Sequence, residues 1–462
     1  MIRNGDRLSL AGQLKLTLQL STPAILSQLS TIVMEYIDAS MVGRLGAQQS
    51  ASIGIVSTSI WLLGGLCSAA STGFSVQVAH FIGADDKENA RKVLRQSLIS
   101  TFLFGVLLAV IGCSISSSLP AWLGGDASIC HDASLYFLVV SVTLPILQLS
   151  FLAGSMLRCS GNMHIPSLLN VLACVLDVIF NALLIFPSAT YHPFGIPIFV
   201  PGAGLGVLGA ALGTALSIVV TAFLMMYYLL FRSTDLKLRK NESRFMPTRS
   251  CLKNAFKIGF PMGCEHAVMC TAQIILTIIV APLGILSIAA NSFAITAESL
   301  CYMPGYGIAD AATTLVGQCI GAGKRELAKR FAWITVGLGM AIMTLMGLVM
   351  YIAAPLMMEM MTPVVDIQQL GSMALRIEAF AEPMFAASIV AYGVFVGAAN
   401  TLIPSLMNLG SMWGVRITLA ALLAPTLGLK GVWIAMCIEL CFRGLIFLIR
   451  LRRSRHWLKA IQ

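Results

Sequence analysis

Long apolar runs alternate with short polar segments along the whole chain. A helix rises 1.5 Å per residue, so about 20 apolar residues cross the hydrocarbon core of a bilayer. The pattern predicts an all-α polytopic membrane protein with twelve transmembrane helices. Their expected ranges are residues 17–41, 51–79, 93–119, 133–157, 164–186, 205–231, 256–281, 287–317, 331–355, 371–396, 403–425 and 430–450.

Two polar segments share one pattern. Segments His80–Arg91 and Gln318–Lys329 each contain Ile-Gly-Ala followed, at the same spacing, by Glu and then by Ala and a basic residue. They lie 238 positions apart, close to half of the 462-residue chain. The same offset matches Pro23 with Pro261, Asn170 with Asn408, and residues 165–168 with 403–406. A self-similarity of this length predicts an internal duplication in which helices 1–6 and 7–12 are the two repeats.

The repeats predict two lobes of the same orientation. Six helices per repeat is an even number, so both halves insert the same way and are related by an axis along the membrane normal. We therefore expect an N-lobe at 1–231, a cytoplasmic linker at 232–255 and a C-lobe at 256–462, with a cleft between the lobes.

Charged residues are scarce and unevenly placed. The chain is 57% hydrophobic and 11% charged, whereas soluble domains carry about 25% charged residues. With the N-terminus in the cytoplasm, the inward-facing segments and their adjoining helix ends hold 26 of the 30 Lys and Arg residues. This bias predicts that both termini are cytoplasmic. It also accounts for the net charge of +10 without a nucleic-acid partner.

Carboxylates inside the predicted helices are functional candidates, because an unpaired charge in a bilayer is costly. Asp38 lies toward the outer end of helix 1, with Glu35 one turn before it. Asp177 lies in helix 5, about 16 Å beyond Pro166 at 1.5 Å per residue. Both aspartates are expected at mid-to-outer depth of the same lobe.

Helix 5 adds amides on the same face. Asn170, Asp177 and Asn181 are spaced i, i+7, i+11, which is the spacing of one helical face. A carboxylate flanked by amides suits either a protonatable site or a hard-cation site. The repeat offset places Leu276 and Val415 opposite the two aspartates, so the cation site is expected in the N-lobe alone.

The C-lobe has charges of its own. Glu298, near the middle of helix 8, is its main functional candidate. We expect Arg416, deep in helix 11, to pair with a carboxylate. Arg376 is expected to pair with Glu378 and Glu382 near the outer interface, and the roles of Glu265 and Asp310 stay open.

Several motifs in sequence order resemble a known family. They are Pro23, Ile37-Asp38, Val42-Gly43-Arg44-Leu45-Gly46, the two Gly-Ala loops, Leu315-Val316-Gly317-Gln318 and Gly206-Val207-Leu208-Gly209-Ala210-Ala211. The chain resembles the multidrug and toxic compound extrusion (MATE) family, within the multidrug/oligosaccharidyl-lipid/polysaccharide exporter superfamily. The resemblance covers both repeats.

The resemblance implies a function. Similar proteins are antiporters driven by H⁺ or Na⁺ that export cationic or amphipathic organic compounds by alternating access. It implies a monomer in a prokaryotic plasma (inner) membrane, no enzymatic activity, and no cofactor beyond the coupling ion. Its partners would be small organic substrates and the lipid bilayer.

The resemblance also implies site residues. Asp38 and Asp177 match the family's helix 1 and helix 5 aspartates, and Thr214 matches a helix 6 threonine of that site. Many members carry Asn four residues before the helix 5 aspartate, where this chain has Ala173, so Asn170 or Asn181 would have to substitute. The candidates for lining the substrate cleft are Glu298, Glu265, Tyr36 and Gln28.

Two alternatives remain at this stage. A lipid-linked oligosaccharide flippase of the same superfamily would need a cationic cleft for pyrophosphate, whereas the spans here carry more acidic than basic residues. A non-transporting membrane scaffold or receptor would have no use for buried carboxylates in one lobe.

Overall fold

The computed structural model of the chain describes residues 9–191, 198–238, 247–453 and 457–458, and these residues are almost entirely helical. The first half contains α1 (Leu10–Gly43), α2 (Ala47–Gly83), α3 (Lys87–Ile115), α4 (Leu119–Trp122), α5 (Ala127–Cys159), α6 (His164–Ile185), strands β1 (Pro187–Tyr191) and β2 (Ile198–Ala203), and α7 (Val207–Tyr227). The second half contains α8 (Arg249–Val280), α9 (Ile285–Gly321), α10 (Arg325–Met361), α11 (Val365–Ala379), α12 (Glu382–Gly397), α13 (Leu402–Ser411), α14 (Thr418–Leu427) and α15 (Leu429–Arg452). Short π-helical segments extend α7 (Tyr228–Arg232) and join α13 to α14 (Met412–Ile417).

The expected twelve-helix architecture is confirmed. Among the described residues, ten helices are long and apolar enough to cross a membrane, and the pair α11 and α12 makes an eleventh span. The twelfth is α1, whose 34 residues carry many Ser, Thr and Gln side chains as well as two carboxylates. One predicted helix, 371–396, is wrong in detail because it is broken between α11 and α12 by a 61° bend.

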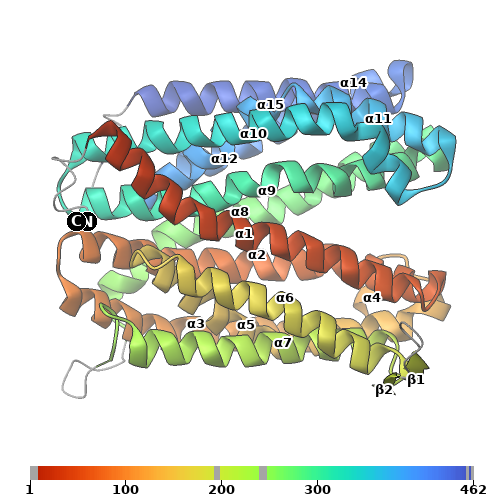
Figure 1. Cartoon of the computed structure of the whole chain (residues 1–462), viewed down its shortest axis with the longest axis horizontal. Coiled ribbons are helices and arrows are strands. Elements are labelled where there is room, and N and C mark those ends of the chain that lie inside the picture. The colour runs from red at the N-terminus through yellow and green to blue at the C-terminus, as the bar shows by residue number, and fades with distance from the viewer. Residues whose placement is uncertain (1–8, 192–197, 239–246, 454–456, 459–462) are drawn as a thin grey trace.

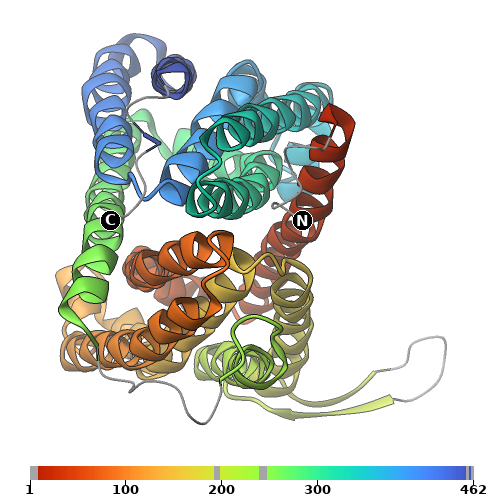
Figure 2. The same ribbon diagram turned by 90° about the vertical axis from the view of Figure 1, so that its left-hand side faces the viewer.

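A β-hairpin interrupts the helical pattern and was not expected. Strands β1 and β2 pair antiparallel from Pro187 opposite Ala203 to Tyr191 opposite Ile198, and the hairpin projects from the lower half of the molecule in Figure 2. The second half has Gly428 alone between α14 and α15. Gly206 before α7 and Gly428 before α15 share a left-handed φ, 58° and 61°. The repeat offset therefore changes from 238 to 222 positions after the hairpin.

The helices form two groups, one above the other in Figure 1, and α1 runs diagonally between them. Helix α1 packs on α9 of the other group as well as on α6 of its own, and α8 packs on α2. Small residues permit these crossings: a Cβ at Gly307 would meet the backbone of Ile25, and a Cβ at Gly73 would meet the Ala255 carbonyl. The first helix of each half is thus shared between the groups.

The two groups meet at one end of the molecule, at left in Figure 1, where α15 ends and α1 begins. There α2 crosses α9 so closely that Gly83 faces the Gln318 backbone and Gly321 faces the His80 backbone. His80 Nε2 lies 2.8 Å from the Gly397 carbonyl oxygen, and Gln318 Nε2 donates to the Cys159 carbonyl at 2.9 Å. Each of these contacts maps onto the other at the 238-residue offset. We call His80, Gly83, Gln318 and Gly321 the crossing, and the Gly-Ala repeats of the sequence are its two sides.

Alanine at the crossing should destabilise the protein. In Gly83→Ala the new Cβ would meet the Gln318 carbonyl, and neither backbone can move without parting the helices. Overpacking of this kind costs about 1–3 kcal/mol, so thermal unfolding in detergent should occur at a lower Tm. Gly337→Ala in α10 is the matched control, because nothing lies within 4 Å of its Cβ position. Equal Tm values for the two variants would contradict the close crossing.

Candidate functional site

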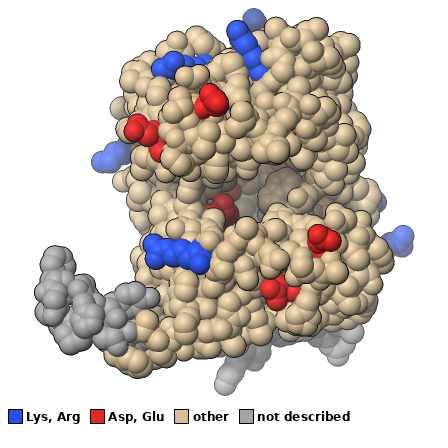
Figure 3. Space-filling model, turned by 90° about the vertical axis from the view of Figure 1, so that its right-hand side faces the viewer, with Lys and Arg blue, Asp and Glu red and all other residues tan. Residues whose placement is uncertain are grey.

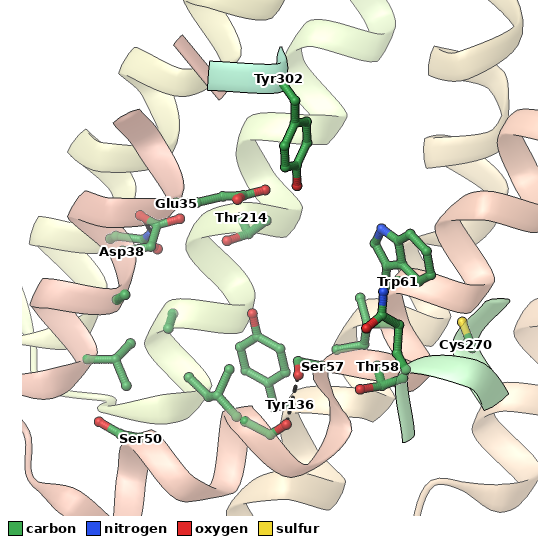
Figure 4. A pocket seen from close by; sticks show the side chains of 18 residues that line it. Glu35, Asp38, Ser50, Ser57, Thr58, Trp61, Tyr136, Thr214, Cys270 and Tyr302 are labelled. Carbon is green, nitrogen blue, oxygen red and sulfur yellow. Dashed lines mark hydrogen bonds between the residues drawn. The ribbon is translucent and has the colours of Figure 1, made fainter. Parts of the chain in front are cut away.

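A cleft opens between the two helix groups at the end opposite the crossing. Its volume is about 820 Å³, and Figure 3 shows it as a hollow with acidic atoms inside. Both groups line it, with Trp61 and Tyr136 from the first and Tyr302 from the second. Glu35 and Asp38 project into it from α1, as Figure 4 shows. The described lining contains these two carboxylates and no Lys or Arg.

Three predicted site residues come together at the wall of the cleft. Asn181 Nδ2 donates to Asp38 Oδ1 at 3.0 Å and to Asp177 Oδ2 at 3.0 Å. Asp177 is fully buried and Asn181 is 1% exposed, whereas Asp38 is half-buried and reaches the cleft. One amide therefore links a carboxylate at the cleft to a carboxylate with no access to solvent.

Local sequence explains this arrangement. Asp177 and Asn181 lie four residues apart on α6, so they share one face of the helix. Gly213 of α7 leaves the space for the amide, since a Cβ there would collide with Asn181 Oδ1. Ser217 of α7 lies 3.4 Å from Asp177 Oδ1. Thr214 of this helix was expected at the site from the sequence, whereas Ser217, on the same face one turn later, was not.

Glu35 lies near Asp38 in the cleft, whereas Asn170 and Thr214 are not hydrogen bonded to either aspartate among the described contacts. Asn170 donates to Ser27 Oγ at 3.0 Å, at another level of α1. Thr214 lines the cleft without a hydrogen bond from its hydroxyl to either carboxylate among those described. Ala173 stands where the resemblance implied an Asn, and the bridging amide comes from Asn181, one turn after Asp177.

The second half holds a carboxylate where the first half holds a serine. At the 238-residue offset, Ser27 and Asn170 correspond to Glu265 and Asn408. Asn408 Nδ2 donates to Glu265 Oε1 at 2.6 Å, and the Tyr392 hydroxyl donates to Oε2 at 2.7 Å. The same helix-to-helix contact thus occurs in both halves, neutral in one and acidic in the other.

Arg416 has the carboxylate partner that the sequence analysis expected. Its Nε lies 3.0 Å from Glu439 Oε2, and Arg443 and Ser411 also bond Glu439, at 2.6 and 2.5 Å. Glu439 was not singled out from the sequence. By the two repeat offsets Glu439 matches Ser217, and Arg416 lies one residue after the match of Asp177. An ion pair therefore stands in the second half where Asp177 and Ser217 meet in the first half.

The predicted pairing of Arg376 with Glu378 and Glu382 is wrong. Arg376 is exposed, donates to the Tyr351 carbonyl at 3.3 Å, and has its guanidinium carbon 5.5 Å from the Tyr351 ring centre. Glu378 and Glu382 have no exposed surface. Residues two apart on a helix point about 200° apart, so Arg376 and Glu378 face opposite sides of α11.

Asp310, the other open question of the second half, lies in α9. It pairs with Arg158 of α5 at 3.8 Å, across the two helix groups. This ion pair therefore belongs to the contact between the groups on the side of the crossing, and Asp310 is not among the residues that line the cleft.

The four cleft candidates from the sequence lie outside the described lining. Glu298 is 6% exposed and Glu265 is bonded within its own half. Tyr36 lines a separate groove of about 300 Å³ with Arg44 and Phe186, because it points about 100° away from Glu35 on the helix. Gln28 is half-buried in α1. The aromatic lining was missed, since apolar spans hold many aromatic residues and nothing in the sequence marks those that face a cleft.

Comparisons with known proteins match both halves of the chain. The MatE family model matches residues 23–183 and again residues 261–422, two matches that begin 238 positions apart. The probable multidrug resistance protein NorM of Thermotoga maritima is 25% identical over 437 residues, covering 94% of this chain and 90% of the relative. The multidrug resistance protein NorM of Burkholderia vietnamiensis is 25% identical over 425 residues, 90% of this chain and 89% of the relative.

Solved structures show the same fold. An outward-facing conformation of a multidrug resistance MATE family transporter of the MOP superfamily matches with a TM-score of 0.88 at 22% identity, over 97% of both chains. A MOP superfamily transporter from Pyrococcus furiosus matches with a TM-score of 0.89 at 22% identity, again over 97% of both chains. The family model spans both repeats, and the shared fold extends over nearly the whole chain. This chain therefore belongs to the MatE family, a family of membrane transporters and not of enzymes.

Proposed function

We propose that this protein exports cationic or amphipathic organic compounds in exchange for H⁺ or Na⁺, with Asp38, Asp177 and Asn181 as the coupling site. The observation that carries the proposal is the single Asn181 amide shared between two carboxylates. Two carboxylates that share one donor away from bulk water repel each other, so the site gains free energy by taking up a cation.

The substrate class follows from the cleft. Glu35 and Asp38 supply negative charge. Trp61, Tyr136 and Tyr302 supply aromatic faces, which attract cations. The pyrophosphate of a lipid-linked oligosaccharide would meet only acidic charge in the described lining. The relatives that carry the name multidrug resistance protein support the same class of substrate.

The protein exchanges substrate for the coupling ion if it cannot bind both at the same time. Asp38 lines the cleft and also shares the Asn181 amide with Asp177. A coupling ion bound at the two carboxylates would therefore neutralise the negative charge that an organic cation in the cleft would contact. The two ligands then favour different states of the protein, which is the condition for coupling. The Asp177 carboxylate adds a buried negative charge that the substrate does not contact.

The structure supports an outward-facing state within this scheme. The cleft opens at the hairpin end and the helix groups meet at the crossing. With the termini in the cytoplasm, as the positions of Lys and Arg predict, the crossing closes the cytoplasmic side. Opening the cytoplasmic side would require α2 and α9 to separate at Gly83 and Gly321. In this orientation both termini would face the cytoplasm of a prokaryotic cell.

Neutralising either aspartate should abolish coupled export. In Asp38→Asn and Asp177→Asn proteoliposomes, efflux of an organic cation driven by an imposed H⁺ or Na⁺ gradient should fall about tenfold or more. A hydrogen bond to a charged group is worth about 1.5–3 kcal/mol, and each variant also removes the charge that the coupling ion neutralises. Asp366→Asn, an exposed carboxylate in the first turn of α11, is the control. Wild-type rates in both site variants would refute the coupling role.

The bridging amide should matter more than the neighbouring one. In Asn181→Ala the two carboxylates lose their shared donor, so the ion concentration for half-maximal transport should shift about tenfold. Asn170→Ala removes the same side chain from the same helix, where it bonds Ser27, and should shift far less. Ion-titrated transport measures both. Similar shifts in the two variants would mean that the bridge has no special role.

A further inference from the structure

Three carboxyl groups meet inside the second half, away from the coupling site. They are Glu298 of α9, Glu378 of α11 and Glu382 of α12, and we call them the glutamate triad. Glu378 and Glu382 are fully buried, and Glu298 is 6% exposed. Glu298 and Glu382 each lie close enough to Glu378 for their charges to interact.

Glu378 and Glu382 accept no hydrogen bond from a side chain outside the triad in the described part of the chain. Both carboxyl oxygens of each, and Oε2 of Glu298, are buried without a donor from a neighbouring residue, but the carboxyl groups of Glu298 and Glu378 lie within hydrogen-bond reach of each other. Leaving a buried polar atom unpaired costs about 1–3 kcal/mol, and more when the group is charged. Glu298 and Glu378 can bond each other only when one of them carries a proton, and Glu382 has no partner among the described residues. The site is therefore completed by something other than the side chains around it.

Nearby cations compensate only part of the charge. Arg416 faces Glu298 and Glu378, but it is already paired with Glu439, which also holds Arg443. Two arginines and Glu439 leave a single positive charge, and Arg443 also faces Glu265. That charge balances at most one member of the triad and leaves about two carboxyl groups that would be uncompensated anions.

The surroundings favour protons over a metal ion. Cys301 lies beside the triad and contacts Met350, and Gly347 of α10 packs against the Glu382 side chain. Hard cations such as Na⁺ and Ca²⁺ prefer several oxygen ligands. The carboxyl groups of the triad have such oxygens, but the described residues contain no group of three or more His, Cys, Asp or Glu side chains placed to hold a metal ion. The other titratable and charged groups that face the triad are Tyr302 of α9, Arg416 of the π-helical segment and Cys437 of α15.

The first half shows that packing alone does not need these acids. At the 238-residue offset the triad corresponds to Ile60, Val140 and Leu144. Pro383, which follows Glu382, corresponds to Pro145, yet α5 runs unbroken through Pro145 while the second half bends by 61° between α11 and α12. The bend and the carboxyl groups therefore occur together, and only in the second half.

Tyr302 lies beside both the cleft and the triad. Tyr302 lines the cleft and points toward Glu35 in Figure 4. Its phenol also interacts electrostatically with Glu298. Glu298 is the one member of the triad with exposed surface. A proton from the cleft would thus reach Glu298 first and pass to Glu378.

We propose that the glutamate triad is a second proton-binding site, which takes up about two protons from the cleft past Tyr302 and adds them to the ions bound at Asp38 and Asp177. It goes beyond the proposed function, because the triad would load protons whichever ion the first site uses. The helix bend next to it gives the site a hinge at which α11 could move against α12 when the protons leave.

Infrared spectroscopy of the protein in liposomes tests the proposal. Protonated carboxylic acids give a carbonyl band that carboxylates lack. At neutral pH the variant Glu378→Gln/Glu382→Gln should lose acid-band intensity equivalent to about two carboxyl groups. The exposed Glu359→Gln on α10 should lose none. An unchanged acid band in the double variant would overturn the proposal, and Glu298→Gln supplies the same readout if the double variant does not fold.

Proton counting separates this proposal from the coupling mechanism. Addition of tetraphenylphosphonium to purified protein in weak buffer with a pH dye should release more protons from wild type than from Glu298→Gln. Asp38→Asn/Asp177→Asn should lose exchange while keeping the acid band of the triad. Equal proton release by wild type and Glu298→Gln would show that the triad does not exchange protons with the cleft. Retained exchange in the aspartate variant would instead refute the coupling site and leave the triad standing.

Discussion

The cost of an uncompensated charge in a hydrocarbon layer governs the interior of this protein. The buried ionisable groups offset this cost in different ways. Arg416 is neutralised by Glu439, Asp310 by Arg158, and Glu265 is held by an amide and a phenol. Within the described part of the chain, the paired aspartates at the cleft and the glutamate triad lack such compensation. The functional sites are therefore expected where a buried charge is not balanced by a partner.

Gene duplication supplies an internal reference for that reasoning. Equivalent helices make equivalent contacts, as the crossing and the pair Ser27–Asn170 against Glu265–Asn408 show. Where buried groups differ between the halves, the difference is chemical and local. Asp177 and Ser217 stand between α6 and α7 where the second half has an ion pair, and Ile, Val and Leu stand in the first half where the second half has the glutamate triad. A scaffold kept for shape alone has no reason to diverge at these places and stay the same elsewhere.

Helix count, repeat register and family were readable from the sequence because each depends on periodicity or on residues in fixed order. Asp38, Asp177 and Asn181 were readable because polar groups in apolar spans are conspicuous. The rest depends on which way a side chain turns. Tyr36 and Glu35 are neighbours in sequence but face different cavities, and Arg376 misses Glu378 for the same reason. The hairpin was missed because its short strands pair only with each other.

The hairpin has a practical consequence for imaging. A membrane particle with two nearly superposable halves is difficult to align, since a half-turn about the pseudo-twofold axis almost restores its outline. Strands β1 and β2 occur in one half only and project away from the helices, as Figure 2 shows. They therefore mark one half for electron cryomicroscopy, and an antibody fragment raised against them would enlarge that mark.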